Sequence, residues 1–101
     1  MHGITITYQY RGEDAPWRKA IETFITAIEN DPRIAGRFTY QVATADDRET
    51  RIHWGRWDSQ ETLSHLQAQG YFKEFSGKVR EFAGDTLKPT PHDITLKSAG
   101  W

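Results

Sequence analysis

The sequence predicts an α+β fold with one four-stranded antiparallel sheet and helices on one face of that sheet. Several short segments alternate apolar and polar residues, which is typical of half-buried strands. Two longer regions repeat apolar residues at helical spacing. Their order along the chain is strand, helix, strand, strand, helix pair, strand. This order is the split βαβ pattern of a ferredoxin-like domain.

The first strand and the first helix are predicted within residues 4–29. Residues 4–10 (ITITYQY) alternate in the manner of a strand, with the bulkier side chains on one face. Asp14 is the expected N-cap of the helix, and Pro16 falls in the first turn, where its missing N–H costs nothing. The helix ends before Pro32, because the residue preceding a proline avoids the helical region. The apolar stripe of this helix comprises Trp17, Ile21, Phe24, Ile25 and Ile28.

The second and third strands are predicted at residues 38–43 and 50–57. In the third strand, alternation places His53 and Trp57 on one face and Ile52 and Trp54 on the other. Both faces therefore carry bulky side chains, and such a strand needs cover on both sides.

Two helical segments follow the third strand. Asp58 is the expected N-cap of the first, with Glu61 completing a capping box. Gly70 marks the end of this helix or a kink, and Gly84 ends the second segment. The second segment has one broad apolar face that comprises Tyr71, Phe72, Phe75, Val79 and Phe82.

The last strand is expected late in the chain. Residues 88–93 contain Pro89 and Pro91, which donate no ladder hydrogen bonds and exclude a central strand there. Residues 92–97 are expected to form a final edge strand through Ile94 and Leu96.

Size and composition limit the classes of function. The 101 residues are enough for a single domain spanning 1–101. The net charge is −1, with no basic stripe for nucleic acid, and cysteine is absent. The four histidines lack the helical spacing of zinc sites, so no metal is expected. No signal peptide or membrane-length apolar run is present, which favours a cytoplasmic protein without membrane contact.

A single chain of this pattern leaves one face of its sheet bare. Exposed aromatic surface on a small domain usually marks an interface. We therefore expect a homodimer in which two sheets meet face to face and close a dimeric α+β barrel. Trp101, at the end of the chain, is a residue that could dock on the partner.

The segment WDSQETLSHL (57–66), followed by YFKEF (71–75), resembles the signature of the antibiotic-biosynthesis-monooxygenase-like family of the dimeric α+β barrel superfamily. The resemblance implies oxidation of phenol- or quinol-like substrates by O₂ without a cofactor, in a pocket between the sheet and the helices. Some members degrade haem, but an ungapped alignment with that branch puts Ser76 at the haem-ligand position and Leu66 at that of a functional tryptophan. Haem degradation is therefore not expected. The alternative is a non-catalytic ligand-binding or stress-responsive barrel.

His65 is the first candidate for a catalytic base or hydrogen-bonding group, and His53 is the second. The spacing of His65 places it off the aliphatic stripe, either in solvent beside Glu61 or at the border of a cavity, and spacing alone favours solvent. A cavity beneath the helices with either imidazole projecting into it would favour catalysis, whereas a filled interior with both in solvent would favour the alternative. The expected substrate-binding residues, each of which also has a purely structural interpretation, are Trp57, Tyr71, Phe72 and Phe75, with Tyr8 and Tyr40 as polar contacts.

Overall fold

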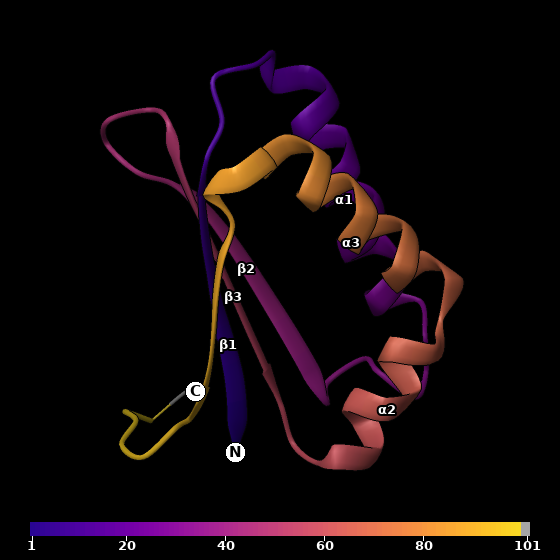
Figure 1. Ribbon diagram of the computed structural model, residues 1–101. Helices are drawn as coiled ribbons and strands as arrows, with labels where there is room; N and C mark the ends of the chain where they lie inside the picture. Colours follow the sequence, from indigo (N-terminus) through magenta and orange to yellow (C-terminus); the bar gives the residue numbers. More distant parts are fainter. Residues whose placement is uncertain (100–101) are drawn as a thin grey trace.

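The computed structural model describes residues 1–99, in which the predicted order of elements is confirmed (Figure 1). The elements are β1 (His2–Gln9), α1 (Asp14–Glu29), β2 (Phe38–Thr44), β3 (Thr50–Trp57), α2 (Gln60–Ala68), α3 (Gly70–Ala83), a 3-10 turn η1 (Gly84–Thr86) and β4 (Lys88–Asp93). Trp101, predicted as a docking residue, lies outside the described residues.

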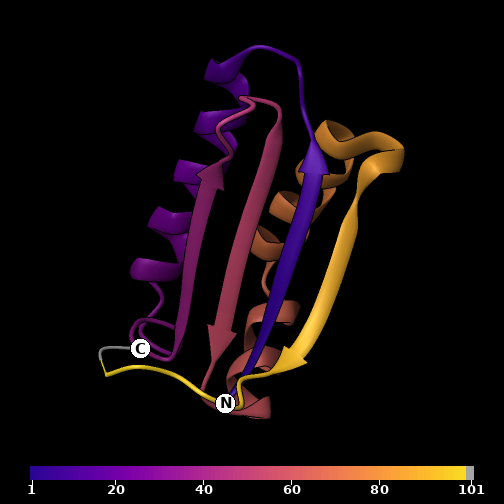
Figure 2. The same cartoon turned by 90° about the vertical axis from the view of Figure 1, so that its left-hand side faces the viewer.

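The four strands form one antiparallel sheet in the order β2-β3-β1-β4. All three α-helices lie on one side of this sheet (Figure 1). Figure 2 shows the strands side by side on the opposite face, which no helix covers. The ferredoxin-like α+β prediction is therefore confirmed. No helix within residues 1–99 combines the length and the apolar character needed to cross a membrane.

The pairing register decides which side chains face the helices. Ile6 of β1 and Val42 of β2 both lie opposite His53, so these three residues share one face of the sheet. Along β3 the burial alternates, and the buried set includes His53 and Trp57. The predicted division of this strand into two faces is confirmed.

Helix N-caps differ from the predictions by one residue. Ser59, not Asp58, is the N-cap of α2, and its hydroxyl oxygen accepts a hydrogen bond from the backbone N–H of Thr62. Asp14 is the first residue within α1 rather than its cap, and its carboxylate pairs with Arg18 one turn later at 2.9 Å. In both cases a neighbouring residue takes the cap position, which sequence patterns locate only to within one or two positions.

The final strand is β4, residues 88–93, and the prediction that it lies at residues 92–97 is wrong. β4 is an edge strand that pairs only with β1. Pro89 and Pro91 are two residues apart, so their missing N–H groups fall on the same side, and an edge strand has one side that needs no partner. Leu96, expected within the strand, is 92% exposed beyond it.

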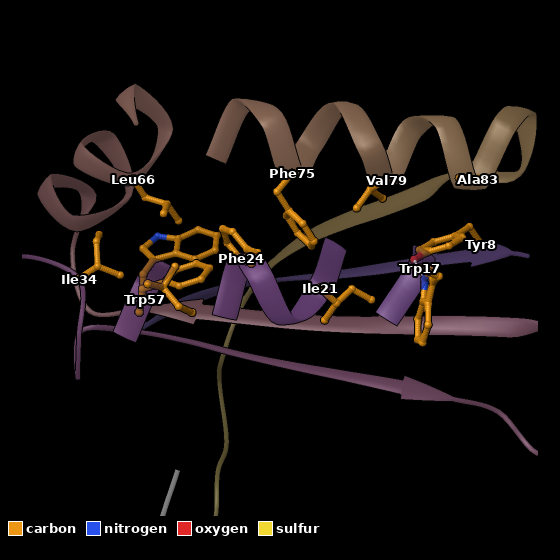
Figure 3. Packing of buried hydrophobic residues seen from close by; sticks show 12 residues of the cluster. Tyr8, Trp17, Ile21, Phe24, Ile34, Trp57, Leu66, Phe75, Val79 and Ala83 are labelled. Atoms are coloured by element: carbon orange, nitrogen blue, oxygen red, sulfur yellow. Dashed lines mark hydrogen bonds between the residues drawn. The ribbon is translucent and has the colours of Figure 1, made fainter. Parts of the chain in front are cut away.

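Aromatic rings form much of the layer between the helices and the sheet. Phe24 of α1 and Phe75 of α3 stack with their centroids 4.0 Å apart and their planes 4° from parallel. Figure 3 shows Trp57 beside Ile34 and Leu66 at one end of this core, with Tyr8 at the other end. Burial of these rings removes a large apolar area from water, which stabilises a domain with few aliphatic residues.

Candidate functional site

The centre of the candidate site is His53, whose side chain β3 directs towards the helices. It is completely buried. The hydroxyl of Tyr8 lies 2.8 Å from its Nε2 atom, and the hydroxyl of Tyr40 lies 2.6 Å from its Nδ1 atom. Trp17 extends the network, because its Nε1–H donates a hydrogen bond of 2.8 Å to the Tyr8 hydroxyl oxygen (Figure 3). Three elements, β1, β2 and β3, thus meet at one imidazole, with α1 contributing the indole.

This network is electrically neutral at neutral pH. Burial lowers the pKa of His53 to about 4, since an imidazolium would lose its hydration in the core. Burial also raises the pKa of Tyr40. It raises the pKa of Tyr8 as well, although the Trp17 hydrogen bond and the charge of Arg51 act in the opposite direction. All three side chains therefore act as neutral hydrogen-bonding groups.

Arg51 places a positive charge beside this network. It lies directly opposite Tyr8 in the strand register and is 6% exposed. Its guanidinium carbon lies 4.2 Å from the ring centroid of Trp17, a cation–π distance. Sequence reasoning missed both Arg51 and Trp17 as site residues. The alternation of residues 50–57 would have placed Arg51 on the His53 face, and Trp17 was assigned only to an apolar stripe.

A second polar cluster joins His65 to Asp31. The Nε2 atom of His65 lies 2.9 Å from Oδ2 of Asp31, and the hydroxyl of Tyr71 donates to the same oxygen at 2.7 Å. The His65 side chain is only 17% exposed, so the interpretation that it lies in solvent is wrong. Asp31 is 34 residues away along the chain, and helical spacing gives no signal of such a partner.

The carboxylate of Asp31 stays charged in this cluster. Burial acts to raise its pKa, but the hydrogen bonds from Tyr71 and His65 and the backbone N–H of Arg33 outweigh that effect and lower the pKa. The pKa of Tyr71 shifts in the opposite direction, because burial and the hydrogen bond to Asp31 both raise it. The cluster therefore holds an anion between a tyrosine and an imidazole.

An open groove of about 400 Å³ lies between α1 and α3. This is a size typical of small-molecule sites. Its lining includes the rings of Phe24, Tyr71 and Phe75 and the charged groups of Lys19, Glu74 and Lys78. Of the predicted substrate-binding residues, Tyr71 and Phe75 line this groove, whereas Trp57, Phe72, Tyr8 and Tyr40 do not.

The phenyl ring of Phe75 connects the groove to the His53 network. It lines the groove, and its centroid is 6.1 Å from that of His53 and 5.7 Å from that of Tyr40. Neither predicted catalytic imidazole lines the groove, and neither lies in solvent. An imidazole projecting into a cavity would favour catalysis, and two imidazoles in solvent would favour binding alone. The structure shows neither arrangement.

Within residues 1–99, no group of three or more His, Cys, Asp or Glu side chains is arranged to hold a metal ion.

A second groove, of about 650 Å³, lies on the helix-free face of the sheet. Trp54 and Arg56 of β3 line it, together with Ile94 and Leu96 of the segment after β4.

The fold and the site together define a small α+β protein whose helix-covered sheet face holds a buried imidazole beneath an aromatic groove. The chain has the fold of several solved structures over almost its whole length. Rv0793 from Mycobacterium tuberculosis has a TM-score of 0.76 at 14% identity, with 98% of each chain covered. SnoaB, a cofactor-independent oxygenase from Streptomyces nogalater, has a TM-score of 0.75 at 11% identity, with 97% of this chain and 96% of that chain covered.

An antibiotic biosynthesis monooxygenase of known structure has a TM-score of 0.73 at 9% identity, with 95% of this chain and 100% of that chain covered. No protein-family model matches the sequence, and no curated protein matches it either. The predicted similarity to antibiotic biosynthesis monooxygenases is therefore confirmed at the level of the fold.

Proposed function

We propose that this protein is a cofactor-independent monooxygenase that acts on a small aromatic or hydrophobic substrate of the phenol or quinol class. The observation that carries the proposal is the groove between α1 and α3, whose lining rings Phe24 and Phe75 also contact the buried Tyr40 and His53 network. Flat rings favour aromatic ligands through offset or edge-to-face contacts. The fold shared with a cofactor-independent oxygenase supports the class of reaction.

The proposed chemistry draws its electrons from the substrate. Removal of the phenol proton gives an electron-rich anion that reduces O₂ directly. A ring C–H then becomes the second carbonyl of a quinone. One oxygen atom enters the product and the other leaves as water, so the four electrons that O₂ accepts all come from the phenol. The protein supplies a base, shape and exclusion of water.

The two histidines have different proposed roles. His65 is the proposed general base at Nδ1, because Asp31 holds its Nε2 side and would stabilise the imidazolium. The imidazole does not line the groove itself, so this role requires the substrate oxygen to pass Tyr71 and reach Nδ1. Tyr71 bonds to the same carboxylate and lines the groove, which connects this cluster to the substrate. His53 is proposed to hydrogen-bond to Tyr40 and so to act on the substrate only through that tyrosine. Its low pKa makes it a weak base, so proton abstraction is assigned to His65.

The aromatic residues behind the groove support its lining. Phe72 lies 6.4 Å from Phe24 between ring centroids, and Trp57 stacks on Phe38 with centroids 6.2 Å apart. Their proposed contribution to substrate binding is to hold Phe24 and Phe75 in place.

We also propose that the protein is a homodimer whose two sheets meet through their helix-free faces. That face carries the half-buried Trp54 and Ile52. The exposed Leu96 lies in the segment that borders the same face. A second copy would cover these apolar groups, which water surrounds in a single chain.

The experiment is O₂ uptake by the purified protein with a chelator present and either 1-naphthol or dithranol, each of which has a ring carbon that can become the second carbonyl. Uptake with equimolar quinone formation is the expected result. His65→Ala should lower the rate by at least about 100-fold, the usual contribution of a general base. His2→Ala, which removes an exposed imidazole paired with Asp93, is the matched control and should leave the rate unchanged. Binding of these compounds without O₂ uptake would overturn the proposal and favour the non-catalytic binding protein.

A further inference from the structure

We propose that the hydrogen bonds through His53 run in one direction, from Trp17 to Tyr40, so that the Tyr40 hydroxyl keeps its proton for a ligand oxygen. The ligand class is an aromatic molecule with a carbonyl or phenolate oxygen. Trp17 is then a positioning residue, and Tyr40 is the group that contacts the ligand. The assignment of direction stands on the protein alone, whereas the ligand step rests on the proposed function.

The direction follows from an inventory of donors and acceptors. The indole of Trp17 can only donate, so the Tyr8 oxygen must accept from it. A neutral imidazole has one N–H donor and one bare nitrogen acceptor. His53 therefore either accepts from Tyr8 at Nε2 and donates from Nδ1 to Tyr40, or donates to Tyr8 and accepts from Tyr40.

The two arrangements leave different protons without a partner. If His53 donates to Tyr8, the Tyr8 oxygen accepts twice and its own proton has no acceptor among residues 1–99. Tyr8 is 1% exposed, so that proton would be stranded in the core. In the opposite arrangement the free proton belongs to Tyr40, whose hydroxyl lies against the completely buried His53. A stranded buried donor costs about 1–3 kcal/mol in either arrangement, so burial does not select one of them. Donor strength selects it: the hydrogen bond from Trp17 and the nearby positive charge of Arg51 both make Tyr8 the better donor, so Tyr8 donates to His53.

A doubly protonated His53 is the third arrangement, and its surroundings disfavour it. The imidazole is completely buried, and no carboxylate in the described chain bonds to it. Arg51, on the same sheet face, adds a positive charge nearby. The bond from Trp17 favours the neutral arrangement in which Tyr8 donates, because a hydroxyl whose oxygen accepts one strong hydrogen bond becomes a better donor.

The position of Tyr40 links this direction of the hydrogen bonds to the groove. Its ring meets Phe24 edge-on at 5.1 Å and Phe75 edge-on at 5.7 Å between centroids. Both phenylalanines line the groove. One layer of aromatic rings thus separates a ligand in the groove from Tyr40. Displacement of the Phe75 ring would bring a ligand oxygen towards the free hydroxyl proton.

The direction is tested by ¹⁵N NMR of the ligand-free protein labelled at histidine. The shifts of the two ring nitrogens, with their couplings to the ring protons, identify the protonated atom. The expected result is a His53 ring protonated at Nδ1 and bare at Nε2. Protonation at Nε2, at both nitrogens, or an even mixture of tautomers near neutral pH would overturn the inference. This readout needs no substrate, so it is independent of whether the protein is an oxygenase.

The ligand step is tested with two bicyclic molecules of nearly equal shape, 1-tetralone and tetralin, which differ in one carbonyl oxygen. Calorimetric titration should show tighter binding of 1-tetralone to the natural protein. Tyr40→Phe should weaken 1-tetralone binding by up to about 10-fold, the worth of one hydrogen bond, and leave tetralin unchanged. Tyr10→Phe, whose hydroxyl bonds to the backbone oxygen of Glu13, is the matched control and should change neither.

Phe75→Leu provides a second test, since a smaller side chain opens the path to Tyr40. This variant should bind 1-tetralone more tightly than the natural protein, and the gain should disappear in the double variant with Tyr40→Phe. Equal binding of 1-tetralone by the natural protein and Tyr40→Phe would overturn the ligand step. Failure of both molecules to bind would also overturn it. If the expected tautomer and binding appear without O₂ uptake, the inference stands and the proposed oxygenase activity fails.

Discussion

The hydroxyl oxygen of Tyr8 lies 2.8 Å from Nε2 of His53, although 45 residues separate them in the chain. The same oxygen accepts a hydrogen bond from Trp17. One phenolic hydroxyl therefore satisfies two buried polar groups at once, and an unsatisfied buried polar group is more costly than a lost hydrogen bond at the surface.

Removal of this hydroxyl should destabilise the protein strongly. Tyr8→Phe leaves both the Trp17 N–H and the His53 Nε2 atom without partners, and we expect a loss of about 2–4 kcal/mol in the free energy of unfolding. Urea denaturation followed by circular dichroism measures it. Tyr10→Phe serves as the control with a loss below about 1 kcal/mol, because only one peripheral bond disappears. Equal losses in the two variants would contradict this account.

The buried imidazole should make stability depend on pH between about 6.5 and 4. Burial lowers the pKa of His53 to about 4, so in this range the unfolded chain binds a proton that the folded chain does not. The contribution of His53 to the free energy of unfolding is fully present above pH 6.5. It decreases as the pH falls towards 4, by about 3 kcal/mol in total.

His53→Gln isolates this contribution, since an amide does not titrate. Urea denaturation at pH 7.5, 5.5 and 4.5 should show a smaller loss of stability on acidification in the variant than in the natural protein. The fold lowers the pKa values of Asp31, Asp47 and Asp58, and their contributions are lost only below about pH 4. A parallel decline in both proteins across the window would contradict the prediction.

The carboxylate of Asp31 should stabilise the fold as well as orient His65 and Tyr71. Asp31→Asn removes the charge that holds His65 and Tyr71, which come from α2 and α3, and we expect a loss of about 1–2 kcal/mol in the free energy of unfolding. Asp14→Asn is the matched control, because it breaks an exposed pair with Arg18 and should have no measurable effect on thermal unfolding. No change of the melting temperature in Asp31→Asn would show that the cluster contributes nothing to the fold.

The helix-free face of the sheet should control assembly. Trp54→Glu puts a charge at its centre, beside Gln41 of the neighbouring strand. Light scattering after size exclusion should then give one chain of 11.7 kDa, where the natural protein gives twice that mass. Glu61→Gln, on α2, changes one charge away from this face and should remain dimeric. A natural protein that is folded and monomeric at micromolar concentration would contradict the proposed dimer.

Local periodicity was sufficient for much of the fold. The alternation of residues 50–57 placed His53 and Trp57 on one face because side chains of a strand repeat every two residues. Helix boundaries were less certain, since Asp58 and Ser59 are both good caps and only the backbone conformation selects one. The location of β4 depended on its being an edge strand, which is a property of the whole sheet rather than of residues 88–93.

The sequence by itself determined the order of elements, the face on which His53 lies and the aromatic character of α3, because strand and helix periods act over a few residues. The tertiary structure alone decided the partners: Tyr8 and Tyr40 for His53, Trp17 for Tyr8, and Asp31 for His65. These contacts join residues that are far apart in the chain or on different elements. Their geometry depends on how the helices pack on the sheet, and no local repeat encodes it.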